Sequence, residues 1–300
     1  MYVITGATGN TGSVVAKRLL AAGKQVRVIG RSADRLQGLA AEGAEPFVAD
    51  LGDAAALTRA FQGAQAVYLV VPPDLRNADV RSYRNRINIA FASALVQAEV
   101  KYAVVLSSIG ADKPEKTGPV VGLHELEQKL NRLPGLNVLH LRAGYFMENT
   151  LAQVGTIQAL GLTAGPLRAD LKLPMIATRD IGAAAAEALL KLDFKGAQTR
   201  ELLGQRDLTM AETAAIIGQA IEKPGLPYVH LPDEQIRPAL LQLGMSGNMV
   251  DLLLEMAGSL NSGYMKALEA RSAHNTTPTS YETFVKEEFV PLFRAKSQAA

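Results

Sequence analysis

The chain has 300 residues, 48% of them hydrophobic, so it can bury a sizeable core in one large α/β domain or in two lobes. Its 31 basic and 29 acidic residues nearly cancel and form no dense basic run, which argues against nucleic acid or an anionic membrane surface as a partner. The absence of cysteine excludes disulfides and thiol catalysis, and the four histidines are not at metal-ligand spacing, so we expect no metal site.

The location of the protein is predicted from two further features. The first predicted strand begins at residue 2, which leaves no room for a signal peptide. No apolar run approaches the roughly 20 residues of a membrane span. We therefore expect a cytoplasmic protein without membrane contact, either a monomer or a homodimer.

The N-terminal stretch YVITGATGNTG joins an apolar strand to a helix through a glycine-rich turn. Gly6, Gly9 and Gly12 are spaced to allow a left-handed turn, a close approach of the backbone to a pyrophosphate, and tight packing of helix on strand. The free N–H groups and positive dipole end of the following helix favour an anion. We expect a Rossmann-type doubly wound parallel sheet that binds a dinucleotide; the alternative is an ordinary βα turn.

The next two strand ends bear on the choice of nucleotide. A strand over residues 25–29 is followed by Arg31, where an acidic residue would bind the ribose of NAD but an arginine accommodates the 2′-phosphate of NADP. Arg31 therefore favours NADP, with Arg35 able to share the role, unless Arg31 is merely a solvated residue. The third strand ends at Asp50, which either faces the adenine or serves as a turn or capping residue before the helix that follows Asp53.

The fourth strand, residues 66–71, is a nearly continuous apolar run, as expected for a parallel strand buried on both faces. It breaks at Pro72-Pro73, so the backbone there is expected to line the nicotinamide half of the site. A long helix over 79–98 follows, and its apolar stripe is interpreted as core.

Five segments together resemble one protein family: GATGNTG, VRVIGRS, VVLSSIGA, LRAGYFMEN and RDIGAAAAEALL. The combination is similar to the NmrA-like, atypical branch of the short-chain dehydrogenase/reductase superfamily, over almost the entire chain. Within that branch it most resembles the group of NADPH-dependent quinone reductases and triphenylmethane-dye reductases. The resemblance implies an NAD(P)-binding Rossmann domain over 1–149 and a smaller C-terminal substrate lobe over 150–300, with residues of about 178–204 returning to the Rossmann sheet.

The resemblance also implies NADP(H) as the cofactor and assigns its contacts. By the family match, Arg31 holds the 2′-phosphate, and Ser107 lies near the nicotinamide together with Tyr145 and Phe146. The residues implied to hold the pyrophosphate are Gly6, Thr8, Gly9, Asn10, Thr11 and Gly12.

One departure from the family pattern concerns proton transfer. Typical members of the superfamily carry Tyr-x-x-x-Lys about a dozen residues after Ser107, but this region reads GPVVGLHELEQK. The catalytic candidates that remain are Ser107, Tyr145 and His124, which begins the helix that carries the missing pair. A histidine of ordinary pKa, about 6.5, could donate a proton at neutral pH. The alternative is a solvated histidine at a helix start, with water as the proton donor.

These features predict an NADPH-dependent reductase that transfers a hydride to a small conjugated acceptor such as a quinone, a dye or a related carbonyl compound. The variable stretch over 162–177 is expected to carry substrate contacts. One alternative is an NADP(H)-sensing regulatory protein with a protein partner and little or no activity. Another is a reductase or isomerase of an unrelated metabolite.

Overall fold

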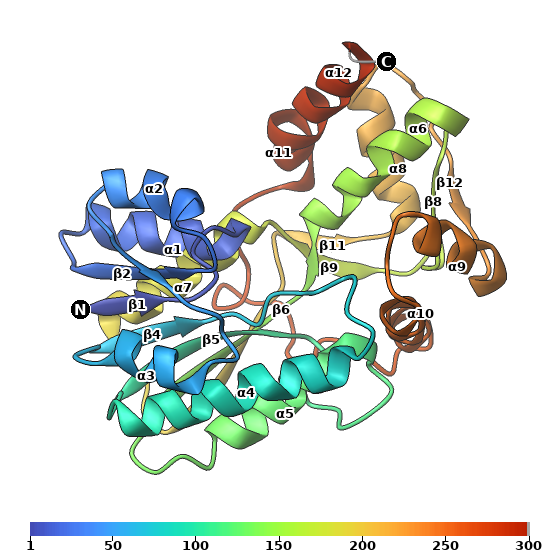
Figure 1. The fold of residues 1–300 in the computed structure, drawn as a ribbon. Coiled ribbons are helices and arrows are strands. Elements are labelled where there is room, and N and C mark those ends of the chain that lie inside the picture. The colour runs from blue at the N-terminus through green and yellow to red at the C-terminus, as the bar shows by residue number, and fades with distance from the viewer. Residues whose placement is uncertain (299–300) are drawn as a thin grey trace.

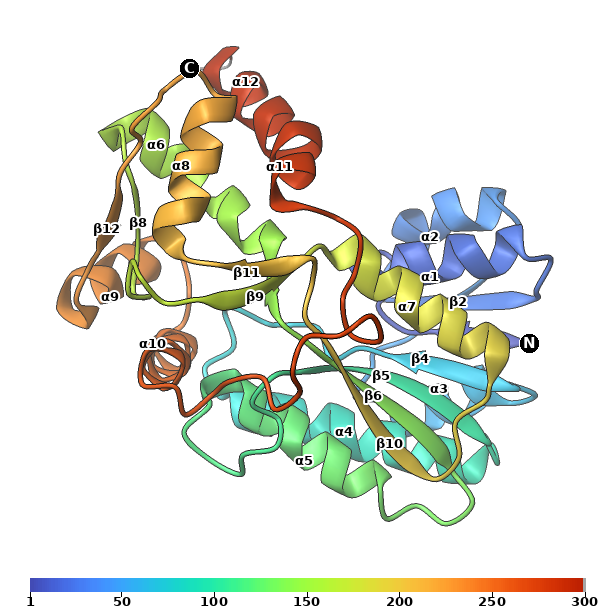
Figure 2. The same cartoon turned by 180° about the vertical axis from the view of Figure 1, so that it is seen from behind.

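The larger of two lobes is built on a seven-stranded sheet with helices on both faces (Figure 1; Figure 2). The computed structural model describes residues 1–298. Neighbouring strands follow the order β10-β6-β5-β4-β1-β2-β3, and each neighbouring pair is parallel. The strands are β1 (Tyr2–Ile4), β2 (Val26–Gly30), β3 (Glu45–Val48), β4 (Ala66–Leu69), β5 (Tyr102–Ser108), β6 (Asn137–Ala143) and β10 (Ala197–Leu202).

This strand order confirms the predicted doubly wound sheet. The chain leaves the central β1 toward β2 and β3 on one side, then crosses back to β4, β5 and β6 on the other. Because successive connections turn away from each other after β1 and β4, a crevice opens at the carboxyl ends of these two strands. The strand order alone therefore locates the place where a ligand can enter.

The sheet is buried where the sequence is most apolar. All four residues of β4, including Tyr68, are buried because helices cover both faces of this central strand. By contrast β3 is an edge strand, largely exposed, and it tolerates Pro46 because one side of an edge strand needs no N–H donor. The helices are α1 (Asn10–Ala21), α2 (Ala33–Ala41) and α7 (Thr178–Lys191) on one face, and α3 (Ala54–Phe61), α4 (Val80–Gln97) and α5 (Val121–Leu130) on the other.

Helix α7 and strand β10 follow residue 150 in the chain yet belong to the sheet lobe, where β10 pairs with β6 and α7 packs against α1. We propose that the lobe boundary lies near residue 149 and that residues of about 178–204 return to the sheet lobe. Contact between α1 and α7 is close at Gly182, where an added Cβ would lie 2.7 Å from the Val14 Cβ and 2.8 Å from the Thr11 carbonyl oxygen. The small residues of α7 therefore let two helix backbones approach each other beside the crevice.

The smaller lobe has two short sheets that join distant parts of the chain. Strand β9 (Leu173–Ile176) lies between β7 (Tyr145–Phe146) and β11 (Arg206–Leu208), and β8 (Thr163–Gly165) pairs with β12 (Tyr228–His230). The variable stretch 162–177 thus contains two strands, because segments on both sides of it in the chain pair with it: β7 precedes it, and β11 and β12 follow it. The helices of this lobe are α6 (Gln153–Leu160), α8 (Met210–Ala220), α9 (Asp233–Gln242), α10 (Gly247–Asn261), α11 (Tyr281–Phe284) and α12 (Val290–Gln298), with short 3₁₀ turns at Gly118–Val120 and Met147–Ala152 and a π turn at Val285–Phe289.

Several hydrogen bonds tie the C-terminal segment to α7 and β10 of the sheet lobe, and one pair of them is buried at the start of α7. The backbone N–H and hydroxyl of Thr279 donate to the two carboxylate oxygens of Asp180, at 2.9 and 2.7 Å, in a buried position. Asp180 belongs to the RDIG segment, which therefore has a structural role at the start of α7. No helix within residues 1–298 is both long and apolar enough to cross a bilayer.

The contact of α1 with α7 gives a stability prediction. Gly182→Ala should lower the free energy of unfolding by about 1–3 kcal/mol, because the new methyl group overpacks the helix contact. The matched control is Gly38→Ala in the interior of α2, where a Cβ meets nothing within 4 Å; it should raise stability by about 0.5–1 kcal/mol. Urea unfolding followed by circular dichroism measures both, and equal effects of the two substitutions would contradict the close contact.

Candidate active site

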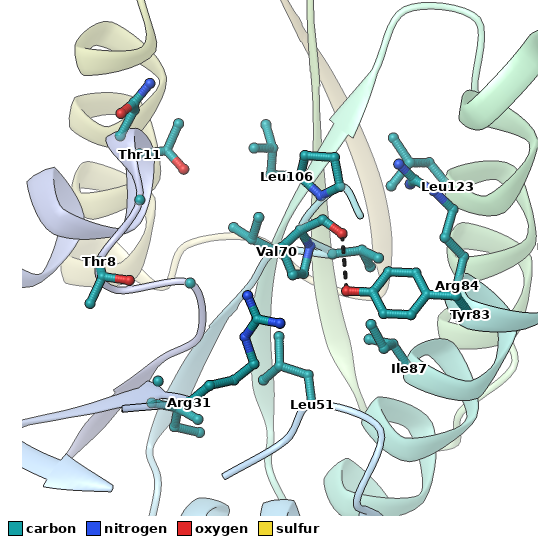
Figure 3. Close-up of a pocket in the computed structure, with 18 of the residues that line it drawn as sticks. Thr8, Thr11, Arg31, Leu51, Val70, Tyr83, Arg84, Ile87, Leu106 and Leu123 are labelled. Atoms are coloured by element: carbon teal, nitrogen blue, oxygen red, sulfur yellow. Dashed lines mark hydrogen bonds between the residues drawn. The ribbon is translucent and has the colours of Figure 1, made fainter. Parts of the chain in front are cut away.

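A cleft of about 1040 Å³ opens at the carboxyl ends of the central strands, where the strand order places the crevice (Figure 3). Its walls come from the glycine turn after β1, the ends of β2, β4 and β5, and one side of α4. Of the residues that the sequence predicts for the site, the following line the cleft: Gly6, Thr8, Gly9, Asn10, Thr11, Arg31, Asp50, Pro72, Ser107 and Phe146.

The glycine turn has the geometry that an anion site requires. Gly6 has a φ of 60°, and α1 begins after Gly9 without a side-chain cap or an acidic residue in its first turn. The first N–H groups of the helix have no intrahelical acceptor and lie at the positive end of its dipole. Gly12 lies behind this surface, where a Cβ would be 2.3 Å from the Gly6 carbonyl oxygen. Gly12 therefore allows α1 to pack on the turn that presents the N–H groups.

At the end of β2, Arg31 extends its guanidinium into the cleft (Figure 3). Arg35 lines the same part of the wall. Within the part of the chain that the structure describes, no carboxylate forms an ion pair with Arg31. A cation is thus available at the strand end where a ribose phosphate would lie in a Rossmann site.

Asp50 lines the cleft beside Arg31, and its carboxylate accepts the Gly52 N–H at 2.7 Å. The cap of α3 is Asp53, which accepts the Ala56 N–H at 3.0 Å. Of the two roles considered for Asp50, capping therefore belongs to Asp53, while Asp50 shapes the turn. An adenine contact for Asp50 stays a prediction.

The hydroxyl of Ser107 donates a hydrogen bond to the buried ion pair of Glu127 with Arg142, below the cleft. It donates to the Oε1 atom of Glu127 at 2.6 Å, and Arg142 binds the same carboxylate through two N–H···O contacts of 3.0 and 2.6 Å. Glu127 is only 2% exposed, so the bond to Ser107 is shielded from water. Ser107 can therefore accept a hydrogen bond from a ligand but cannot donate one, because its hydroxyl hydrogen is already donated to the Glu127 carboxylate.

The structure does not place His124 on the cleft wall. Its Nδ1–H donates to the Ala111 carbonyl oxygen at 2.8 Å, and the ring borders a shallow surface pocket that includes Arg81 and Glu125. The helix presents this position to the surface because the residues that face the sheet lobe are Leu126 and Leu130. A proton-donor role for His124 remains an untested prediction, and this geometry argues against it.

Tyr145 also lies outside the cleft lining, although its neighbour Phe146 is part of it. The two residues form the short strand β7, in which successive side chains point to opposite faces. Tyr145 borders a second cavity of about 350 Å³ inside the smaller lobe, together with Tyr228 and Leu240. Its predicted place beside the nicotinamide does not agree with this arrangement.

Helix α4 forms one wall of the cleft that was not predicted from the sequence. Tyr83, Arg84 and Ile87 line the cleft, and the Tyr83 hydroxyl lies 3.4 Å from the Pro72 carbonyl oxygen (Figure 3). The available signal was the helical spacing of Tyr83 and Ile87 in the first turns of the helix that follows the Pro72-Pro73 break. We interpreted this apolar stripe as core, which is correct for its other half, such as Phe91.

Thr178 of α7 completes the wall near Phe146. Its N–H and hydroxyl both donate to Glu148 Oε1, at 2.8 and 2.5 Å. Burial raises the pKa of the Glu148 carboxyl, and the hydrogen bonds from Thr178 partly offset that rise. Glu148 belongs to LRAGYFMEN, so this family segment fastens the start of α7 to the wall of the cleft. Among the described residues, no three metal-binding side chains come together.

Comparison with known proteins gives consistent matches along the chain. Quinone oxidoreductase 2 of Escherichia coli (strain K12) is 30% identical over 286 residues, which are 92% of this chain and 95% of that protein. The NAD(P)H azoreductase of Xenophilus azovorans is 30% identical over 260 residues, 85% of this chain and 86% of that protein. The crystal structure of the NADPH-dependent quinone oxidoreductase from Escherichia coli complexed with NADPH matches with a TM-score of 0.75 at 25% identity, covering 100% of this chain and 99% of that one.

The model of the NmrA-like family matches residues 2–289. This match and the 30% identical relatives confirm the resemblance predicted from the five sequence segments. The protein belongs to the NmrA-like family.

Proposed function

We propose that this protein is an NADPH-dependent reductase that transfers a hydride to a small conjugated acceptor such as a quinone or a dye. The observation that carries the proposal is the cleft itself, which combines an anion-binding helix start, the unpaired Arg31 and an apolar wall. Support comes from relatives named as a quinone oxidoreductase and an NAD(P)H azoreductase, and from the similar structure complexed with NADPH.

The residues of the cleft fit NADP(H). The N–H groups at the start of α1 would bind the pyrophosphate, and Arg31, with Arg35, would bind the 2′-phosphate. Pro72 and Phe146 would border the nicotinamide. Bound there, NADPH supplies a hydride, which is two electrons and one hydrogen nucleus.

The cleft binds and orients the acceptor without supplying a strong acid. Addition of a hydride to a quinone would give the hydroquinone monoanion, a phenolate that then takes one proton from water to become the neutral hydroquinone. The Ser107 hydroxyl donates its hydrogen bond to Glu127 and not into the cleft. Tyr83, whose pKa is raised by burial, donates to the Pro72 carbonyl oxygen at 3.4 Å. An acceptor whose reduced form is a stabilised anion suits this site, because the product needs no enzymic acid during hydride transfer.

The proposed activity is tested by stopped-flow absorbance at the NADPH band. Bound NADPH should be oxidised by at least one class in a panel of quinones, azo dyes, triphenylmethane dyes and enals. If bound NADPH stays unoxidised with every class of acceptor, the reductase proposal is wrong, and the alternative of an NADP(H)-sensing protein is then tested. A pull-down with and without NADP, showing a partner that depends on the cofactor, would then support the sensor.

Cofactor preference depends on Arg31. Arg31→Ala should weaken NADPH binding by roughly tenfold or more and leave NADH binding nearly unchanged, because charge-assisted hydrogen bonds to a phosphate contribute on the order of 1.5–3 kcal/mol. Fluorescence titration measures both affinities. Arg18→Ala, which removes an exposed arginine from the far end of α1, is the matched control. Equal losses for NADPH and NADH would show that Arg31 is structural.

The position of His124 predicts a small effect on catalysis. His124→Gln should change the maximal rate of hydride transfer by less than about threefold between pH 5.5 and 8.5, because a positioned acid contributes about 10²–10⁴-fold and this ring lies off the cleft. The rate is measured in single-turnover experiments with a quinone. A hundredfold loss together with a missing acid limb would instead establish His124 as the proton donor.

A further inference from the structure

Arg84 is a buried cation on the α4 wall of the cleft. The residue is 8% exposed, and its side chain packs along α5, where a Cβ added to Gly122 would lie 2.7 Å from the Arg84 Cδ. In Figure 3 its guanidinium lies beside Leu123, across the cleft from Thr8 and Thr11. The charge is therefore on the wall opposite the phosphate-binding turn.

No ion pair or hydrogen bond holds the Arg84 side chain within residues 1–298, and its Nε atom is buried without an acceptor. Two nearby arginines behave differently: Arg142 forms a two-point contact with Glu127, and Arg81, on the same helix as Arg84, binds Glu125 at 2.8 Å. Burial lowers the pKa of Arg84, and no carboxylate offsets that effect. A buried cation without a counter-ion is unfavourable unless a partner neutralises it.

The groups around Arg84 cannot supply that partner. Asn88, one turn later, has a buried Oδ1 atom without a donor, but a neutral amide oxygen does not neutralise a guanidinium. Glu115 and Glu255 border the other side of Arg84, but among the described residues neither forms an ion pair with it: Glu115 pairs with Lys116 at 3.7 Å, and Glu255 Oε1 accepts the Gly118 N–H at 2.9 Å. Among the described residues of the cleft lining, Asp50 is the only carboxylate, and it belongs to the turn after β3. The missing anion therefore has to come from a ligand.

The surroundings of Arg84 limit what that ligand can be. The phosphates of the dinucleotide already have two sites, at the start of α1 and at Arg31, and both lie away from Arg84 (Figure 3). The wall around Arg84 is apolar, with Ile87, Val120 and Leu123. A cation set in an apolar wall suits a flat aromatic molecule that carries an oxyanion.

We propose that Arg84 binds an anionic group on the acceptor, so that the enzyme prefers conjugated acceptors bearing a carboxylate or sulfonate to neutral ones and to cationic dyes. The inference rests on the proposed reductase function and narrows its substrate class. Arg84 acts here as a binding residue, so its contribution should be found mainly in KM.

The first test compares one anionic and one neutral quinone, 1,4-naphthoquinone-2-sulfonate and 2-methyl-1,4-naphthoquinone, with malachite green as the cationic acceptor. Arg84→Met should lower the ratio of kcat/KM for the sulfonate to that for the neutral quinone by at least roughly tenfold, since a charge-assisted contact is lost. Arg84→Lys, which keeps the charge, should give an intermediate ratio. Arg81→Met, which removes an exposed arginine of the same helix, should leave the ratio unchanged.

The second test needs no turnover. Isothermal titration of the NADP⁺ complex with 2-naphthoate and with its neutral isostere 2-naphthamide should show the anion binding at least roughly tenfold more tightly to the wild type, with the preference lost in Arg84→Met. The affinity for NADP⁺ should change by less than about threefold in the variant. A wild-type protein that binds the amide as tightly as the acid would overturn the inference even if no variant folds.

The two proposals fail in different ways. If the wild type reduces both quinones but Arg84→Met leaves their ratio within twofold, the reductase function stands and the role of Arg84 is wrong. If no acceptor is reduced, yet 2-naphthoate binding depends on Arg84, the reductase function is wrong and the anion site stands as a site for a non-reacting ligand. Thermal unfolding checks the fold of Arg84→Met, which should be at least as stable as the wild type because replacing a buried unpaired charge by an apolar side chain removes a desolvation penalty.

Discussion

The site depends on how closely α1 packs on the turn that precedes it. The turn carbonyl of Gly6 leaves no space for a Cβ at Gly12, and α7 adds a second close contact where Gly182 meets Thr11 and Val14. Because α1 packs against both the glycine turn and α7, its position is fixed. Its first N–H groups therefore point into the crevice at the carboxyl ends of β1 and β4. An anion can be bound there by backbone groups alone, so the side chains of the cleft are free to determine which dinucleotide and which second ligand enter.

The positive charges of the cleft lie at two separate places, and we assign one of them to the cofactor and the other to the acceptor. Arg31 follows the end of β2 and Arg35 lies in the first turn of α2, while Arg84 lies on the α4 wall among apolar side chains. Glu127, which accepts the hydrogen bond of Ser107, is neutralised by Arg142, so the buried pair orients a hydroxyl without adding net negative charge below the cleft. The result is a site that favours anions at separate points.

Two family segments have structural roles that their position in the sequence does not reveal. Glu148 of LRAGYFMEN binds the start of α7 through Thr178, and Asp180 of RDIG binds the C-terminal segment through Thr279. Both contacts lie where the smaller lobe meets the sheet lobe (Figure 2). They position Phe146 and Thr178 on the cleft wall while the second cavity, with Tyr145, stays within the smaller lobe.

Short stretches of sequence were enough to predict the glycine turn, the place of Arg31 after β2 and the absence of the Tyr-x-x-x-Lys pair, because each of these features depends on residues close together in the chain. The glycine turn and the strand that follows its helix also indicated a doubly wound parallel sheet, which the strand order confirms. Which wall of the cleft each side chain faces depends instead on contacts between distant parts of the chain. Ser107 meets Glu127 across 20 positions, β8 pairs with a strand 65 positions later, and Arg84 faces the cleft because α5 packs beside α4. Such contacts between distant segments leave no periodic signal, and His124 and Tyr145 were therefore expected at a cleft that they do not line.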